Sequence, residues 1–179
     1  MHIFKHFFTI TKHRHKVMIN CFKCGLIWQG LTHDLSKYSF QEFFRGAKYY
    51  QGTYSPNHNE RLKKGYSLAW MHHRGRNKHH LDYWVDDDLV THKLSPVDVP
   101  KKYICESICD RIAASKVYRR KEFKPIDVYN YYKKEEEYLP LTEYTKNEMN
   151  FLLNYYLENG EKELFKYIKH TYLKNKNNK

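Results

Sequence analysis

Glycine and proline are scarce in this chain of 179 residues, which contains 7 glycines and 5 prolines. All-β sandwiches need frequent turns built from these residues, so their scarcity argues against that class of fold. The sequence also lacks any repeat at the period of a solenoid protein. Its length suits one domain, and a hydrophobic content of 41% is enough for a core rich in tyrosine and phenylalanine.

Long apolar runs are missing as well. The N-terminal stretch MHIFKHFFTITKHRHK has neither the apolar centre nor the small-residue cleavage site of a signal peptide. Because no segment is long and apolar enough to cross a bilayer, we expect no membrane partner. A chain that keeps its cysteines reduced and has no export signal is expected to be cytoplasmic.

Cysteine is confined to two pairs, CFKC at Cys21 and Cys24 and CESIC at Cys105 and Cys109. Four thiolates at these positions are a candidate zinc site. Both pairs, however, have helical spacing and apolar neighbours, which favours buried free thiols.

Acidic residues number 20 against 32 lysines and arginines, and the net charge is +12. Such an excess favours anionic partners, and we expect a phosphate-containing small molecule or a nucleic acid. Part of the excess lies at the C-terminus, where we expect residues 175–179 to form a basic, frayed tail.

Hydrophobic periodicity predicts an all-α fold over a single domain, residues 1–179. The expected helices cover residues 4–24, 26–37, 40–50, 60–73, a short stretch from 78, 101–118, 125–139, 142–160 and 161–173. Composition predicts a loop over 51–60 and an acidic, proline-containing connection over 86–100. We expect residues 10–118 to form the core that carries the chemistry and residues 119–174 to form a helical brace packed on it.

Some details of these helices are also predicted. Ser39 followed by Glu42 has the spacing of a capping box, which predicts a helix start near Phe40. The side chains expected to face inward from the third and fourth helices are Phe43, Phe44, Ala47, Leu62, Tyr66, Ala69 and Trp70.

Histidine is abundant, with 12 residues, and the order of the histidines and aspartates is more informative than their number. Inward side chains from facing helices of a bundle can converge on one point. The imidazoles and carboxylates that stand in a suitable order are His13, His33, Asp34, His72, His73, His79, His80 and Asp110. Asp110 lies in the apolar stretch ICDRIAA, where a buried carboxylate is costly unless it binds a cation or pairs with a residue such as Arg111 or Arg119.

The motifs HRHKV, LTHDLSK and ICDRIAA, which contain His13, the His33–Asp34 doublet and Asp110, resemble those of the HD-domain superfamily of metal-dependent phosphohydrolases. Members of that superfamily are all-α and carry a first histidine, a His–Asp doublet and a closing aspartate on successive helices. Binuclear members add histidines in the slot that HHRGRNKHH occupies here. The likeness covers about residues 10–118, and it departs from the family pattern at Ser36, where glycine is usual. The stretches GLTHDLSKYS and YSLAWMHHRGRNKHH also resemble a small uncharacterised family from bacteria and phages.

The resemblance implies an HD-domain-like bundle that holds one or two divalent ions. Imidazole and carboxylate groups suit Mn, Fe, Co, Ni or Zn. The implied ligands are His13, His33, Asp34, His73, His79, His80 and Asp110. Asp34 is expected to lie between two ions. Because neighbours on a helix point about 100° apart, one histidine of each pair is expected to face the metal directly, with His73 and His80 preferred.

The resemblance further implies a phosphohydrolase that acts on a nucleotide, a nucleic-acid end or a related phosphate ester, using a metal-activated water. The residues expected to take part in catalysis are Asp34, Lys37 and Asp82, of which Asp82 is a candidate general base or imidazole partner. The residues expected to contact phosphate are Lys37, Arg76, Asn77 and Lys78.

Three alternatives stay open at this point. The same ligand order occurs in HD-type di-iron oxygenases, which redox-active iron would indicate. A non-catalytic nucleic-acid-binding module with a structural metal would show steep salt dependence and no turnover. In the third alternative the histidines hold no metal, while Lys37 and RGRNK are ordinary solvated surface.

Overall fold

The computed structural model of the protein describes residues 1–175, in which the regular secondary structure is helical apart from one two-stranded hairpin. The helices are α1 (Ile3–Lys23), α2 (Ile27–Thr32), α3 (Phe40–Tyr49), α4 (Pro56–Lys64), α5 (Leu68–Arg74), α6 (Lys101–Arg119), α7 (Pro125–Glu136) and α8 (Glu143–Tyr167). Short helical turns form η1 (Leu35–Tyr38), η2 (Leu81–Tyr83), η3 (Arg120–Glu122) and the π-helical η4 (Ile168–Tyr172). The predicted all-α fold is confirmed. Of the predicted tail, residues 176–179 lie outside the described part of the chain.

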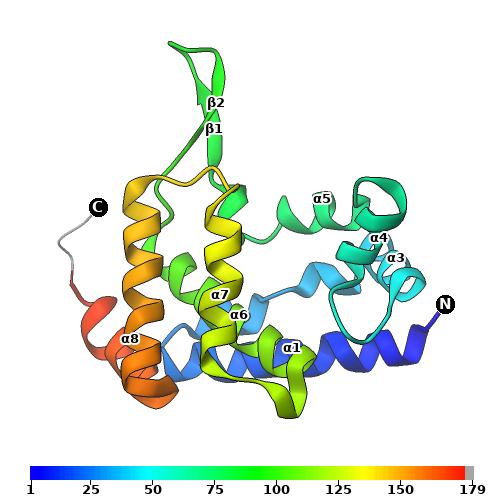
Figure 1. The fold of residues 1–179 in the computed structure, drawn as a ribbon, viewed down its shortest axis with the longest axis horizontal. Helices are drawn as coiled ribbons and strands as arrows, with labels where there is room; N and C mark the ends of the chain where they lie inside the picture. Colours follow the sequence, from blue (N-terminus) through cyan, green and yellow to red (C-terminus); the bar gives the residue numbers. More distant parts are fainter. Residues whose placement is uncertain (176–179) are drawn as a thin grey trace.

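The helices form two groups at opposite ends of α1. Helices α6, α7 and α8 lie side by side at one end, whereas α3, α4 and α5 gather at the other (Figure 1). The main hydrophobic core fills the first group, where Val17 of α1, Ile108 and Ile112 of α6, and Leu153 of α8 are fully buried. The predicted packing of the C-terminal helices on the rest of the fold is therefore confirmed.

Thr142 and Gly160 set the start of α8 and a kink within it. The Thr142 hydroxyl caps the helix by accepting a hydrogen bond from the Thr145 backbone N–H at 3.1 Å. Gly160 has φ of 79°, a conformation that glycine adopts without steric cost, and it breaks the helical path there. The helices expected over 142–160 and 161–173 are therefore one element with a kink at Gly160, where the first was expected to end.

The predicted loop at 51–60 and helix at 60–73 were wrong in detail. Helix α4 already begins at Pro56, with Ser55 as its cap, and ends at Gly65, whose φ is 81°. A second cap, Ser67, then starts α5. This break rotates the predicted inward face away from the core, so Leu62 is 68% exposed.

Other inward predictions had mixed outcomes. Ala47 and Ala69 are buried as expected, whereas Phe44 and Tyr66 are exposed. The short helix expected from residue 78 is replaced by the single turn η2 (Leu81–Tyr83), which β1 follows.

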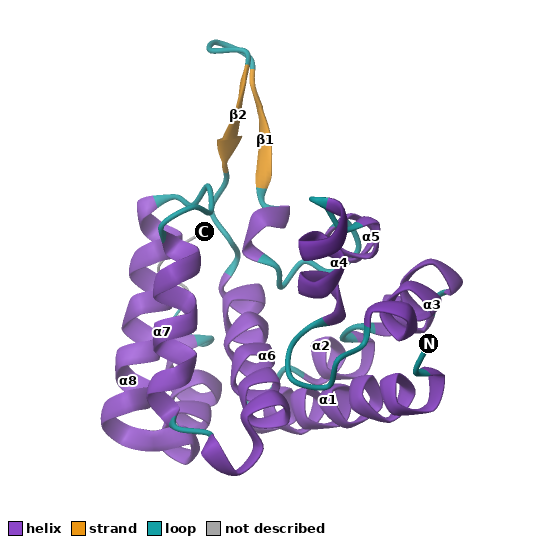
Figure 2. Cartoon of the chain, turned by 45° about the vertical axis from the view of Figure 1, so that its right-hand side comes forward, coloured by secondary structure: helices purple, strands orange, loops and turns teal. Residues whose placement is uncertain are grey.

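The acidic connection at 86–100 contains an antiparallel hairpin in place of an irregular loop. Strand β1 (Val85–Asp88) pairs with β2 (Lys93–Pro96), with Val85 opposite Pro96. The hairpin projects away from both helical groups (Figure 2), and its tip residues Leu89 and Val90 are 84% and 90% exposed.

The four cysteines are buried in the contact between α1 and α6, where the Cys24 and Cys109 sulfurs are 3.7 Å apart. Burial raises the pKa values of the Cys105 and Cys109 thiols well above the usual range, which disfavours the thiolate that zinc requires. The free-thiol interpretation therefore fits this packing better than the zinc site. Among the described residues, no helix has the length and apolar character needed to cross a membrane.

Candidate metal centre

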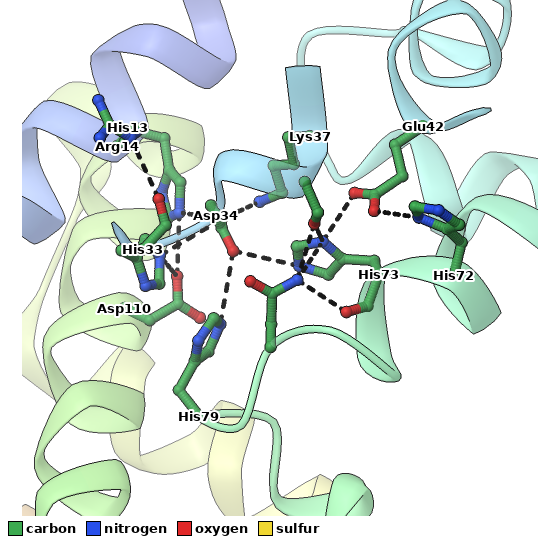
Figure 3. A network of polar contacts seen from close by, with 12 residues as sticks. His13, Arg14, His33, Asp34, Lys37, Glu42, His72, His73, His79 and Asp110 are labelled. Carbon is green, nitrogen blue, oxygen red and sulfur yellow. Dashed lines mark hydrogen bonds and ion pairs between the residues drawn. The ribbon is translucent and has the colours of Figure 1, made fainter. Parts of the chain in front are cut away.

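All seven predicted ligands meet in two groups that share Asp34. Figure 3 labels six of them, all but His80. Within each group, the candidate ligand atoms lie within 4.8 Å of one another. The first group is His13, His33, Asp34 and Asp110, and the second is Asp34, His73, His79 and His80. Residues from α1, the α2–η1 junction, α5, the following loop and α6 therefore converge on one interior point.

The His33–Asp34 doublet converges because the chain leaves the helix there. The predicted helix over 26–37 ends at Thr32, and Asp34 adopts the left-handed conformation with φ of 55° and ψ of 22°. Aspartate tolerates this conformation better than most residues, but it still carries a backbone cost that clusters at functional sites. In a continuous helix the two side chains would diverge by about 100°, so this break lets both point to the same place.

Arg14 holds this junction in place from α1. Its guanidinium donates hydrogen bonds to the backbone carbonyls of Leu31 and His33, the latter at 3.1 Å. Carbonyls at the end of a helix lack helical partners, so this contact satisfies them and ties the doublet to the helix that carries His13.

The first group is held at short distances. His13 Nε2 lies 2.9 Å from Asp110 Oδ1 and 3.4 Å from Asp34 Oδ2. His33 Nε2 lies 3.3 Å from the same Asp34 oxygen and 3.5 Å from Asp110 Oδ1. Asp110 therefore faces imidazoles, while the arginines considered as its partners, Arg111 and Arg119, bind Glu135 and Asp127.

The second group approaches the other oxygen of Asp34. His73 Nε2 lies 3.3 Å and His79 Nε2 lies 3.6 Å from Asp34 Oδ1. The preference for His73 over His72 agrees with this geometry, because His72 is outside both groups. His79 and His80 both belong to the second group, so the expectation of one histidine per pair does not describe this pair.

Glu106, a residue that sequence reasoning missed, fixes the orientation of two imidazoles. Its Oε1 lies 2.9 Å from His33 Nδ1 and 3.1 Å from His79 Nδ1. A carboxylate accepts the Nδ1 protons, which leaves both Nε2 atoms as acceptors turned toward Asp34. Glu106 stands one helical turn before Asp110, and this spacing is the signal that was available.

Glu42 orients the imidazoles of His72 and His73 in the same way. Its two oxygens lie 2.6 Å from His72 Nδ1 and 2.8 Å from His73 Nδ1. The capping-box prediction was half correct, since Ser39 Oγ does accept from the Glu42 backbone N–H at 3.4 Å. The Glu42 carboxylate turns to the histidines instead of back to the helix start.

Comparison with protein families adds one finding to this geometry. A family model described as "Family of unknown function (DUF5662)" matches residues 2–155. The chain belongs to the DUF5662 family. No curated protein and no solved structure matches it. The matched residues include every member of the two groups around Asp34. The candidate centre of this DUF5662 protein therefore lies within the segment that the family model covers.

Several interior atoms of this DUF5662 centre have no hydrogen-bond partner among residues 1–175. They include Asp34 Oδ1 and Nε2 of His13, His33, His79 and His80, while Asp34 Oδ2 has the ion pair with Lys37. Buried polar atoms are nearly always satisfied, so several unsatisfied ones that face a common point need a missing partner. A divalent cation supplies such a partner for nitrogen and carboxylate oxygen together, and the donor set therefore fits a metal ion.

The charge of the cluster also favours a bound cation. The cluster contains one ammonium, from Lys37, and four carboxylates, from Asp34, Glu42, Glu106 and Asp110. Burial opposes ionisation of Asp34, but the neighbouring His33, Lys37 and His73 hold its pKa well below the usual value. Burial likewise lowers the pKa of His33, but the Asp34 carboxylate and its other acidic neighbours raise it well above normal. Excess negative charge thus has to be balanced by protons on the imidazoles or by a cation.

Lys37 is the predicted phosphate contact that lies at the centre. Its Nζ is 2.5 Å from Asp34 Oδ2, and 27% of its side chain is exposed. Burial alone would lower the pKa of Lys37, but Asp34 and Asp110 raise it above the ordinary value, so the ammonium stays charged. It is a fixed cation at the border between the ligand groups and solvent.

The other predicted phosphate contacts are not members of the two ligand groups. Asn77 is buried, and its amide donates to Ser36 Oγ at 2.8 Å and to the His73 carbonyl at 2.7 Å. Arg76 and Lys78 are exposed, and Arg76 donates to the His72 carbonyl at 3.3 Å. The structure therefore gives Asn77 a positioning contact beside His73, whereas the two basic residues face solvent.

Asp82 does not join the ligand groups. Its Oδ2 lies 3.5 Å from an Arg74 nitrogen, and burial raises its pKa despite this neighbour. The imidazole N–H partners expected of Asp82 are supplied by Glu106 and Glu42. A general-base role for Asp82 stays a prediction.

Proposed function

We propose that this DUF5662 protein is a metal-dependent phosphohydrolase that acts on a nucleotide, a nucleic-acid end or a related phosphate ester. The observation that carries the proposal is the position of Asp34 between two sets of histidines, most of whose Nε2 atoms have no hydrogen-bond partner among residues 1–175. The resemblance to HD-domain phosphohydrolases supports it, because that resemblance rests on the same residues.

Two sets of residues would hold the ions. His13, His33, Asp34 and Asp110 form one set, and His73, His79 and His80 approach the free side of Asp34. When bound, divalent ions of this kind supply a water of lowered pKa and neutralise phosphate oxygens.

The protein's own residues prepare that chemistry. Glu106 and Glu42 hold the Nδ1 protons of their imidazoles, so the Nε2 atoms stay directed inward. Lys37 holds a positive charge next to Asp34 with part of its side chain in solvent, where a phosphate oxygen of the substrate can reach it. Catalysis in this proposal depends on such fixed charges, which act strongly where water is excluded.

The test combines elemental analysis with a phosphatase panel of nucleotides and short oligonucleotides. We expect purified protein to contain close to one or two equivalents of a transition metal and to release phosphate. Asp34→Ala should fold with an unchanged circular-dichroism spectrum but bind less than about a tenth of an equivalent. Asp98→Asn, at an exposed aspartate outside the site, is the matched control and should retain metal and activity.

The outcomes separate the alternatives. Iron that changes oxidation state, without phosphate release, would favour an oxygenase. Bound metal with salt-sensitive nucleic-acid binding and no turnover would favour a binding module with a structural ion. Protein without metal after expression in metal-supplemented medium would remove the proposal.

A further inference from the structure

A small cavity lies directly beside the candidate metal centre, between α1, the start of α4 and the end of α6. Its volume is about 40 Å³, and the polar residues that line it come from these three elements, from η1 and from α3. They are His6, Lys37, Glu42, Ser55, Asn57 and Tyr118, and both Glu42 oxygens are bonded to His72 and His73. A water-sized occupant needs about 10–15 Å³ of such space, so the cavity holds roughly three oxygen-sized atoms.

One wall of this cavity carries a buried side chain without a partner. His6 is 5% exposed, and its Nδ1 makes no hydrogen bond among the described residues. Burial, together with the nearby Lys37, lowers the pKa of His6 to about 4, so the imidazole is neutral at physiological pH. A neutral, buried and unpartnered imidazole on a cavity wall is a ready hydrogen-bonding group for a ligand.

The opposite walls add donors and positive charge. Lys37 and Tyr118 line the cavity, and the phenol of Tyr118 can donate a hydrogen bond. Helix α4, nine residues long, begins at the cavity with its cap Ser55 and with Asn57 in the first turn. The N–H groups of Asn57 and His58 bond to Ser55, so this helix start offers an anion the positive end of its dipole rather than free backbone donors.

Backbone packing keeps His6 in this wall. Its ring lies against Gly46 of α3, where an added Cβ would be 2.4 Å from Nε2. Any larger residue at position 46 would therefore push the imidazole out of its place. This close approach gives the cavity its shape and provides a way to block it.

Two residues join the cavity to the metal centre. Lys37 faces the cavity and also contacts Asp34, and Glu42 lines the cavity while binding His72 and His73 (Figure 3). A single cation thus lies between two adjacent positions for anionic groups. The space is too small for a nucleobase and suits one phosphoryl group.

We propose that this cavity is a second phosphoryl subsite, so that the substrate carries two neighbouring phosphoryl groups. One group lies at the histidine–aspartate cluster and the other in the cavity, with Lys37 between them. This inference rests on the proposed function for the identity of the reaction. The presence of an anion-binding cavity does not depend on it.

The first experiment measures binding of inorganic phosphate to the full-length protein after chelation, by titration calorimetry. Chelation removes any ion that would hold phosphate at the histidine–aspartate cluster, so binding under these conditions reports on the cavity. Tyr118→Phe removes one donor and should weaken binding about tenfold. Gly46→Ala should abolish it by displacing His6. Tyr131→Phe, at an exposed tyrosine on α7, is the matched control and should bind as wild type does.

The second experiment compares a nucleoside diphosphate with p-nitrophenyl phosphate as substrates of the metal-loaded protein. Tyr118→Phe should lower kcat/KM about tenfold for the diphosphate and leave the aryl monophosphate unchanged. Equal losses on both substrates would overturn the assignment of two phosphoryl groups.

The two proposals fail in different ways. If no phosphate ester is hydrolysed, the proposed function is wrong, but phosphate binding to the metal-free protein still decides whether the subsite exists. If wild-type protein does not bind phosphate, or if Tyr118→Phe and Gly46→Ala bind it as tightly as wild type does, the subsite is wrong whatever the activity.

Discussion

Two regions of the molecule, residues 27–80 and residues 101–172, have different kinds of interior. The second region contributes most of the main hydrophobic core, whereas no residue between 27 and 80 belongs to that core. The interior of the first region is polar instead. Its buried polar side chains are His33, Asp34, Glu42, Asn59, Glu60, Ser67, His73, Asn77 and His79.

The polar region is held by specific hydrogen bonds. Glu60 accepts from the Ser67 hydroxyl at 2.6 Å, and the Asn59 amide donates to the Tyr49 carbonyl at 2.8 Å. Such bonds add only about 1 kcal/mol each, but a buried group that loses its partner costs more. The lesson is that one region is stabilised by burial of apolar area, whereas the other depends on its buried polar groups having their partners, which in our proposal include an ion.

The largest effect should come from truncation in the apolar region. Leu153 is fully buried, so Leu153→Ala removes packed atoms and leaves a void, at a cost of about 2–5 kcal/mol in the free energy of unfolding. Leu62→Ala is the matched control, because Leu62 is 68% exposed and the same change there should cost less than about 0.5 kcal/mol. Denaturant unfolding measures both, and equal costs would contradict the comparison.

Removal of metal should act on the polar region. At a hundredfold excess over its dissociation constant, an ion that binds the folded state alone contributes about 2.7 kcal/mol. After chelation we expect faster amide hydrogen exchange over residues 27–80 and little change in α8, measured by mass spectrometry of peptides. Uniform acceleration along the chain would show that the two regions do not differ in this respect.

Loss of an orienting carboxylate should have a smaller effect. Glu106→Gln keeps the size of the side chain but weakens the contacts to His33 and His79, and we expect metal affinity to fall about 10- to 100-fold. Glu158→Gln, at an exposed position on α8, should leave affinity unchanged. Competition with a chelating dye gives the affinity, and an unchanged value for Glu106→Gln would reject the orienting role.

Lowering the pH should produce the smallest difference in local stability between the two regions. Burial raises the pKa values of Glu42 and Glu106, but hydrogen bonds from His73 and His33 lower them below the ordinary value. A carboxyl with a lowered pKa stabilises the folded state above its unfolded pKa, near 4.3, and this stability is lost as pH falls through the folded pKa. Metal-free protein should therefore loosen over residues 27–80 below about pH 4 before α8 does, which hydrogen exchange at several pH values can detect.

Sequence reasoning located the candidate ligands because they lie in short motifs with a known order. His13, the His33–Asp34 doublet and Asp110 could be found without knowing how the helices pack. Glu106 was missed because a glutamate in a helix is ordinarily a surface residue, although its spacing from Asp110 places both on one face. Glu42 was assigned to a capping box, a local role that its long-range contact with the histidines overrides.

The fold itself was predictable where apolar spacing is regular, as in α6 and α8. It was less predictable between 51 and 100, where polar and charged residues dominate and periodicity is weak. Gly65 followed by the cap Ser67 was the available signal for two helices in place of one. The hairpin over 85–96 pairs with itself alone, so no pattern of burial marked its strands.

That hairpin also gives experimenters a convenient handle. Because Leu89 and Val90 extend into solvent at the far end of β1 and β2, a fluorophore or an affinity peptide introduced there would touch neither helical group. Molecules tethered to a sensor chip through this tip would leave the metal centre and the neighbouring cavity free for titration.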